Sequence, residues 1–221
     1  MKITKLLRVI VSIPKTIYFN FRVLPFPIAC KMPFFLAYDV KLGALSGKIK
    51  ISAPTIRRFT VRIGLGGSEN IQSQKGYFSC GKNAEIVFSE NVAIGAGNSI
   101  MVADGTACFG SGFTSNKNCT IACSAGLHFG EDVMLGYKVS IRDSDGHPIV
   151  QDGVCKLSAS PIDVGSHVWL CSETHLLKGC MIPEGSILGY GSIALGKYKH
   201  ANSLIAGYPA KEIQQGISWE R

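Results

Sequence analysis

The sequence predicts an all-β solenoid of short parallel strands, and three observations lead to this prediction. Aliphatic residues recur every six positions in the second half of the chain, at Val164, Leu170, Leu176, Ile182, Leu188 and Ala194. A small or β-branched residue stands four positions after each of the first five, at Val168, Thr174, Cys180, Ser186 and Ser192. The 25 glycines are spread along the chain without a collagen period, which is typical of many turns.

A period of six fits neither a helix nor one long strand. On a helix it would scatter the aliphatic residues over several faces. A long strand needs an apolar residue at every second position, which Ser166, Glu173 and Lys178 break. A short strand followed by a turn does fit, and three such sides close one coil of a solenoid. The repeated aliphatic residues are therefore expected to point into its core.

The same rhythm appears upstream, at Phe129, Leu135 and Ile141 and again at Phe88, Ile94 and Ile100. It slips between residues 102 and 123, which predicts an irregular side or an inserted loop there. Residues 143–161 interrupt the repeat and leave the rhythm intact on both sides. Such an interruption is typical of an external loop at a binding face.

Composition indicates a folded chain with an anionic partner. Hydrophobic residues make up 46% and charged residues 17%, and the formal net charge is +8. No nucleic-acid-binding motif is present in the sequence, so nucleic acid is not the expected partner. Cofactor phosphates or an anionic membrane surface account for the charge equally well.

The eight cysteines are interpreted as reduced thiols of a cytoplasmic protein. They form no CxxC pair, and the chain is larger than most disulfide-stapled domains. Cys123 and Cys180 are expected to fill the core. Cys119 and Cys123 lack a second ligand pair, so no metal is expected.

Several motifs together resemble the hexapeptide-repeat acyltransferases. They are the loop SDGHPI, the run PIDVGSHVWL and the later run IAGYPAKEI, and the firm resemblance covers roughly residues 86 to 213. The closest similarity is to capsular or exopolysaccharide O-acetyltransferases and to galactoside and maltose acetyltransferases. The resemblance implies a left-handed parallel β-helix, acetyl-CoA as the donor, and a homotrimer with each active site between neighbouring solenoids.

The interrupting loop holds the predicted catalytic centre. The resemblance points to His147 as the general base, a role that suits imidazole because it titrates near neutral pH. Asp143 and Asp145 are expected either to orient the imidazole or bind a sugar hydroxyl, or to hydrogen-bond the backbone of the turn. The sequence leaves these alternatives open.

Further residues are predicted around the donor and acceptor. Trp169 points outward and needs a cover, either the His147 loop, a neighbouring subunit or the acyl-CoA arm, and a role as a site wall is favoured. The N–H of Gly165 is a candidate for the oxyanion, and the lysines near the C-terminus are candidates for the coenzyme A phosphates. These are Lys197, Lys199 and Lys211, and the family's usual Val-Thr-Lys run is replaced here by LGKYKHANS.

Three segments are expected: a mixed helical and extended N-terminal cap over 1–45, the β-helix over 46–205 with its protruding loop 143–161, and a tail over 206–221. The first segment combines aromatic and basic residues with four prolines. A cap on the open end of the solenoid is favoured over peripheral contact with membrane or a lipid-linked glycan, because prolines disfavour a continuous amphipathic helix.

The predicted function is transfer of an acetyl group from acetyl-CoA to a hydroxyl of a sugar or oligosaccharide, in capsular or exopolysaccharide biosynthesis. Acetyl transfer to a small molecule such as an antibiotic, a free sugar or an amino acid stays open. A zinc hydratase of the γ-carbonic-anhydrase type needs two histidines five residues apart, and no pair here has that spacing. A non-enzymatic trimeric scaffold is disfavoured because it gains nothing from the loop.

Overall fold

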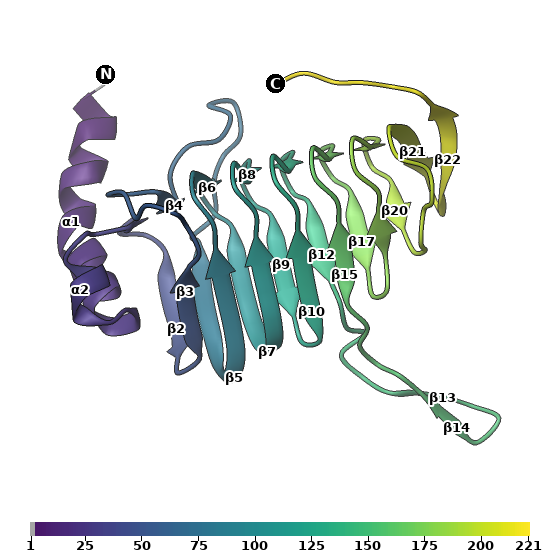
Figure 1. Cartoon of the computed structure of the whole chain (residues 1–221), viewed down its shortest axis with the longest axis horizontal. Helices are drawn as coiled ribbons and strands as arrows, with labels where there is room; N and C mark the ends of the chain where they lie inside the picture. Colours follow the sequence, from purple (N-terminus) through teal and green to yellow (C-terminus); the bar gives the residue numbers. More distant parts are fainter. Residues whose placement is uncertain (1–2) are drawn as a thin grey trace.

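The computed structural model describes residues 3–221, which fold as a parallel β-helix, so the predicted all-β solenoid class is confirmed (Figure 1). The coils stack their strands in three parallel ladders, one along each side of the solenoid. The first ladder contains β1 (Phe34–Leu36), β4 (Val61–Ile63), β6 (Val92–Ile94), β8 (Thr114–Ser115), β11 (Met134–Leu135), β16 (Trp169–Leu170), β19 (Ile187–Leu188) and β21 (Ser203–Gly207).

The other two ladders share two long, bent strands. The second contains β2 (Lys41–Leu45), β5 (Tyr77–Phe88), β7 (Ser99–Phe109), β9 (Thr120–Cys123), β12 (Ser140–Arg142), β17 (His175–Leu177) and β20 (Ile193–Ala194). The third contains β3 (Lys48–Ile51), the second halves of β5 and β7, β10 (Gly126–Phe129), β15 (Ile162–Val164) and β18 (Met181–Ile182).

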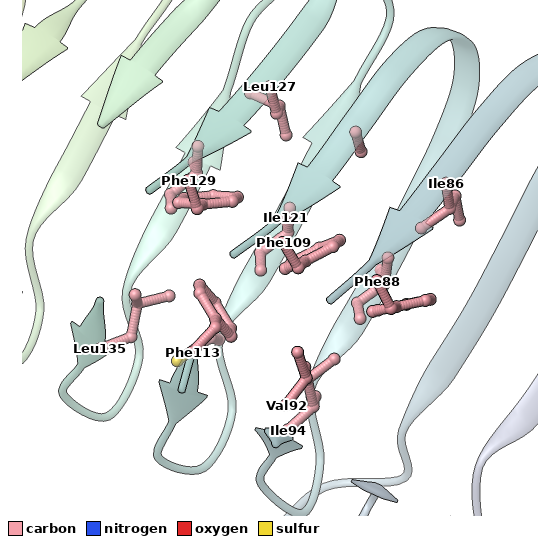
Figure 2. Close-up of a cluster of buried hydrophobic side chains, with 14 of the residues drawn as sticks. Ile86, Phe88, Val92, Ile94, Phe109, Phe113, Ile121, Leu127, Phe129 and Leu135 are labelled. Atoms are coloured by element: carbon pink, nitrogen blue, oxygen red, sulfur yellow. The ribbon is translucent and has the colours of Figure 1, made fainter. Parts of the chain in front are cut away.

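The repeated aliphatic residues fill the interior, as the period of six predicts. Leu170, Leu176 and Leu188 are fully buried, and so are the small residues of the repeat such as Val168 and Thr174. On the third side the core contains a stack of phenylalanines (Figure 2). The ring of Phe109 stacks on Phe88 and Phe129, with centroids 5.0 and 5.3 Å apart. Identical rings thus pack directly above one another, because the parallel register aligns equivalent positions.

The stretch between residues 102 and 123 is an irregular side, the first of the two alternatives, and contains no inserted loop. It forms β7, β8 and β9, which pair in parallel with the neighbouring coils, with one register shift between β5 and β7. The rhythm slips because the corner between the second and third sides is longer here. Inward residues across this corner stand nine positions apart at Ile100 and Phe109, but six apart at Leu176 and Ile182. The loop 143–161 leaves from the same corner, so it is the largest of these expansions.

The solenoid begins earlier than residue 46. β1 and β2 are already members of the ladders, so the predicted boundary at residue 45 is wrong, and residues 1–2 of that segment lie outside the described residues. Two helices precede the solenoid: α1 (Ile3–Val23) and α2 (Phe26–Ala29). α1 continues through Pro14, contrary to expectation, because Pro14 lies on its exposed side, away from the solenoid. No helix among the described residues is long and apolar enough to cross a bilayer.

Polar side chains attach α1 to the edge of the first coil. The Thr16 hydroxyl bonds both the N–H and the carbonyl oxygen of Leu36, at 3.0 Å each. The Asn20 amide does the same for Phe34, donating to its carbonyl at 2.9 Å and accepting from its N–H at 3.1 Å. These bonds replace the missing neighbour of β1, so the open edge of the first ladder is satisfied there.

The C-terminal end is closed differently. β22 (Ala210–Gln215) pairs antiparallel with β21, so it ends the first ladder by reversing direction. β21 spans Ser203–Gly207, and the predicted boundary at residue 205 therefore cuts through a strand. The chain then returns along the solenoid, as described below.

The eight cysteines are all free thiols within the described residues. Cys80, Cys119, Cys123 and Cys180 are buried, and burial raises the pKa of Cys180 to about 12. Cys123 and Cys180 thus fill the core as predicted.

Candidate active site

The loop 143–161 leaves the solenoid between β12 and β15 and projects well beyond the coils (Figure 1). Its outer part is a hairpin of β13 (Ile149–Gln151) and β14 (Val154–Lys156). Its neck is held by backbone hydrogen bonds, from Asp145 N–H to Ser158 O at 2.8 Å and from Ser160 N–H to Asp143 O at 2.9 Å. The loop therefore starts and ends at a closed, hydrogen-bonded base.

Asp143 anchors this base to the coil before it. Its side chain is buried, and its carboxylate accepts hydrogen bonds from the backbone N–H groups of Ser124, Ala125 and Gly126 at 2.8, 2.7 and 2.8 Å. Both carboxylate oxygens are thus occupied by backbone N–H groups at the corner between β9 and β10. The structure places Asp143 in the support of the loop, which favours backbone hydrogen bonding among the alternatives left open for it.

Asp145 supports the neck from the other side. Its carboxylate pairs with Lys178 Nζ at 2.5 Å, and the same ammonium donates to the Leu157 carbonyl at 2.6 Å. Lys178 thus joins the first and last parts of the loop to the following coil. The sequence analysis did not assign Lys178 to the site. It used this residue only to argue against one long strand. Only the stacking of coils brings it beside residues 145 and 157.

His147 stands at the bend between this neck and the hairpin, and its side chain is exposed. Gly146 before it has a φ of +81°, a conformation that glycine adopts without strain. Within residues 3–221 no group hydrogen-bonds to the His147 ring in the structure, so both ring nitrogens are available to a molecule from outside the chain. Asp143 and Asp145 are held by hydrogen bonds and an ion pair, whereas the His147 imidazole is free of such contacts within the described chain.

Trp169 lies on β16 with its side chain half-buried, and part of its cover comes from an unexpected source. Trp219, in the segment after β22, places its ring 6.0 Å from that of Trp169. The predicted covers were the His147 loop, a neighbouring subunit and the donor's arm. The returning C-terminal segment supplies the contact within the chain instead.

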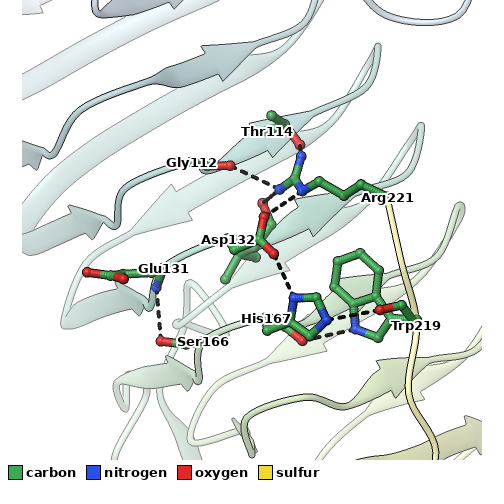
Figure 3. A network of polar contacts seen from close by, with 9 residues as sticks. Gly112, Thr114, Glu131, Asp132, Ser166, His167, Trp219 and Arg221 are labelled. Atoms are coloured by element: carbon green, nitrogen blue, oxygen red, sulfur yellow. Dashed lines mark hydrogen bonds and ion pairs between the residues drawn. The ribbon is translucent and has the colours of Figure 1, made fainter.

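This C-terminal segment is fastened along one corner of the solenoid (Figure 3). The Trp219 ring stacks on His167 at 4.1 Å, and its Nε1–H donates to the His167 carbonyl at 3.0 Å. Asp132 lies between His167 Nδ1, 2.6 Å away, and Arg221 Nε, 2.5 Å away. Desolvation opposes the charge on Asp132, but the hydrogen bonds from His167 and Arg221 lower the pKa of its carboxyl.

Gly165 does not present its N–H to a ligand. That N–H donates to the Ile182 carbonyl at 2.9 Å within the ladder, so it is unavailable to an oxyanion. A side chain at this position would clash with the backbone of Glu184, 2.6 Å from an added Cβ. The glycine is explained by close stacking of two coils, which corrects the predicted role.

The three predicted lysines gather at the C-terminal end. Lys197, Lys199 and Lys211 line an open groove of about 340 Å³ together with Tyr198, His200, Ala210 and Glu212. A hydrogen bond from His200 and the N–H of Lys199 hold the pKa of Glu212 at about 2, so its carboxylate stays charged. The groove is open and basic with one acidic residue on its wall, and can accept an anionic group at its lysines.

Another hollow of the single chain lies elsewhere. It measures about 360 Å³, sits between α1 and residues 65–69, and has Arg8 and Lys117 on its walls. None of the predicted site residues lines it. No group of three or more potential metal ligands gathers in the part of the chain that the structure describes.

Comparison with known proteins finds similarity to acetyltransferases. No family model matches the sequence. A Schizosaccharomyces pombe protein named as an acetyltransferase is 34% identical over 111 residues, which are 48% of this chain and 52% of that protein. The lipopolysaccharide biosynthesis O-acetyl transferase WbbJ of Escherichia coli is 27% identical over 144 residues, 60% of this chain and 73% of the relative. The solved polysialic acid O-acetyltransferase OatWY is 21% identical, with a TM-score of 0.46 over 83% of this chain and 89% of that chain.

The chain spans about half the length of most of the curated relatives it matches. Its fold is a parallel β-helix with a histidine-bearing loop at one corner. The chain is similar in sequence to proteins named as acetyltransferases, which agrees with the resemblance of its motifs.

Proposed function

We propose that the chain is an O-acetyltransferase that moves an acetyl group from acetyl-CoA to a sugar hydroxyl, with His147 as general base. The observation that carries the proposal is the contrast inside the loop. Asp143 and Asp145 are committed to holding it in place, whereas the His147 ring is exposed and without a partner in the described chain. A firmly anchored loop that presents a free imidazole is the arrangement that proton transfer from an external substrate needs.

The proposed reaction is a direct transfer within a ternary complex. His147 takes the proton of the acceptor hydroxyl while the hydroxyl oxygen attacks the thioester carbonyl. The tetrahedral intermediate then collapses and breaks the C–S bond, and the departing coenzyme A thiolate takes the proton back from the imidazolium. The products are the acetyl ester and free coenzyme A, and the histidine returns to its starting state.

The donor and acceptor assignments have separate support. Lys197, Lys199 and Lys211 offer positive charge to the coenzyme A phosphates, and the groove between them is open to solvent. A sugar acceptor is supported by the name of the WbbJ relative, an O-acetyl transferase of lipopolysaccharide biosynthesis. Trp169 is proposed as a wall of the site, since sugars pack well against a partly exposed indole.

A homotrimer is proposed because one chain supplies too few walls. The hairpin beside His147 exposes Ile149, Val150, Val154 and Leu157, and none of the predicted site residues lines the hollow beside α1. An arm with this much apolar surface suits a neighbouring copy, which would also enclose the imidazole. Light scattering is expected to report three chains at micromolar concentration.

The test of the function is thiol release from acetyl-CoA with a panel of oligosaccharides and small acceptors. His147→Ala is expected to lower the rate by about two to four orders of magnitude, the usual contribution of a general base. The melting temperature should stay close to that of the parent, because an exposed side chain contributes little packing.

His175→Ala is the matched control, since His175 is an exposed histidine on β17 outside the loop. It should keep nearly full activity. Retention of more than about a tenth of the rate in the His147 variant would remove His147 from the mechanism.

A further inference from the structure

The outward face of α1 is apolar throughout its central part. From residue 6 to residue 21, every exposed side chain is apolar. The exposed residues are Leu6, Leu7, Ile10, Val11, Ile13, Pro14, Ile17, Tyr18 and Phe21. We call them the N-terminal apolar face. In an ordinary surface helix the apolar side turns toward the core, so this helix has the opposite orientation.

The orientation is set by the polar side of the helix. Ser12, Thr16 and Asn20 follow one another at intervals of four, and all three are buried. Their side chains bond to the backbone of Tyr38, Leu36 and Phe34 respectively. A rotation of α1 that hid its apolar face would break these bonds and leave the β1 edge unsatisfied. The exposed apolar face is therefore built into the attachment of the helix.

The same end of the chain carries all of the net positive charge. Residues 1–63 contain twelve lysines and arginines and a single acidic residue, a formal charge of +11, whereas residues 64–221 contain eleven basic and fourteen acidic residues, a charge of −3. The acidic residue, Asp39, is paired with Arg8 at 2.8 Å. Exposed basic residues near α1 include Arg22 and Lys31, and Arg57 and Arg58 lie beside them, because Phe59 N–H bonds to Met32 O at 2.9 Å.

We propose that this end of the solenoid docks on an anionic lipid surface, with α1 lying in the bilayer interface. An interfacial helix combines an apolar face with neighbouring basic residues, and both features occur here. The helix lies at the outer end of the solenoid (Figure 1). Its apolar side chains are exposed, and at its C-terminal end the Phe21 ring lies 5.8 Å from that of Phe26 on α2. Spanning is not proposed, because the opposite side of α1 is polar and bonded to β1.

A lipid surface fits better than the other occupants. A second copy docked through this face would bring two strongly basic ends together, and like charges repel. A nucleic acid would match the charge but leave the apolar side chains uncovered. Anionic lipid satisfies both properties at once. The proposal is independent of the acyl-transfer chemistry, since none of the residues assigned to that chemistry lies in α1.

The test uses the full-length chain and two kinds of vesicle, phosphatidylcholine alone and phosphatidylcholine with phosphatidylglycerol. Co-sedimentation is expected with the anionic vesicles and should weaken as salt is added. The double variant Val11→Gln/Ile17→Gln should weaken this binding by about tenfold or more, and Arg57→Gln/Arg58→Gln should weaken it at low salt. Circular dichroism should show unchanged melting, because these side chains are exposed.

Leu195→Gln/Ile213→Gln is the matched control at the opposite end. Its two side chains are 49% and 63% exposed, against 56% and 45% for Val11 and Ile17. It should bind vesicles like the parent. The proposal is overturned if the parent ignores anionic vesicles, if the control loses as much binding as the α1 variant, or if ultracentrifugation shows that the α1 variant instead abolishes self-association.

Discussion

The two ends of the solenoid protect an open edge of the same ladder in different ways. At the N-terminal end, side chains of α1 bond to the backbone of β1. At the C-terminal end, the backbone of β22 pairs with β21 in the antiparallel sense. Both solutions prevent edge-to-edge aggregation, but they leave different surfaces behind. β22 uses its own backbone N–H and carbonyl groups to pair with β21. α1 uses only the side chains of its polar side, so its other side stays exposed.

The difference shows why the apolar face of α1 is tolerated at the N-terminal end. A helix satisfies its own backbone hydrogen bonds, so its outward side chains are free to serve another contact. β22 has mostly exposed polar and charged residues on its outer side, such as Lys211, Gln214 and Gln215. α1 and β22 therefore both protect a strand edge, but the outer surface of α1 is apolar and that of β22 is mainly polar.

Substitution in the core between the two ends should lower the unfolding free energy the most. Changes at either end can be compared with this value. Leu176→Asp places a carboxylate in the interior at a fully buried position and should cost several kcal/mol of unfolding free energy. Leu177→Asp is the control one residue away, at a position 37% exposed, and should cost about 1 kcal/mol or less. Urea denaturation measures both. Equal stability of the two variants would contradict the assigned register.

The N-terminal attachment should come next. Asn20→Ala removes the partners of both the N–H and the carbonyl of Phe34, which are buried against the helix, and should cost about 2–4 kcal/mol. Ile17→Ala, on the outward side of the same helix, should change stability by about 0.5 kcal/mol or less. Thermal unfolding of both variants provides the measurement. If Ile17→Ala proved the more harmful, the helix would not be held by its polar side.

The C-terminal fastening should give the smallest effect. Asp132→Asn removes the carboxylate between His167 and Arg221 and should cost about 1 kcal/mol or less, since these groups are partly exposed. Asp163→Asn is the control, an exposed carboxylate 3.3 Å from His128, and should have no effect on the segment. Tryptophan fluorescence during urea denaturation reports Trp169 and Trp219 together.

The same fastening should depend on pH with a defined sign. The pKa of Asp132 is lower in the folded chain than in the unfolded one, so its contribution is present above the unfolded value, about 4. It should be lost as pH falls through the lowered folded value. In a fluorescence titration below about pH 4, the parent should release Trp219 and the Asp132→Asn variant should lack this transition. A transition of equal size in both proteins would assign it to another group.

How much could be predicted from the sequence depends on the range of each interaction. The inward register of Leu170, Leu176 and Ile182 follows from a local period of six, because strand and turn repeat identically in every coil. The position of the loop follows from the interruption of that period. The sequence also marked His147 as the loop's imidazole, and the structure leaves that side chain exposed.

The tertiary structure alone decided the partners that lie one or more coils away. Asp143 meets backbone N–H groups 17 to 19 residues before it, and Trp219 stacks on a histidine 52 residues away. It also decided that Gly165 serves close stacking and that the polar side of α1 faces inward. Neither follows from a period or motif, because both depend on which backbone groups the neighbouring coil leaves unpaired or brings near. The sequence by itself determined the solenoid and its inward residues, since those repeat locally; the stacking of coils decided what each outward residue touches.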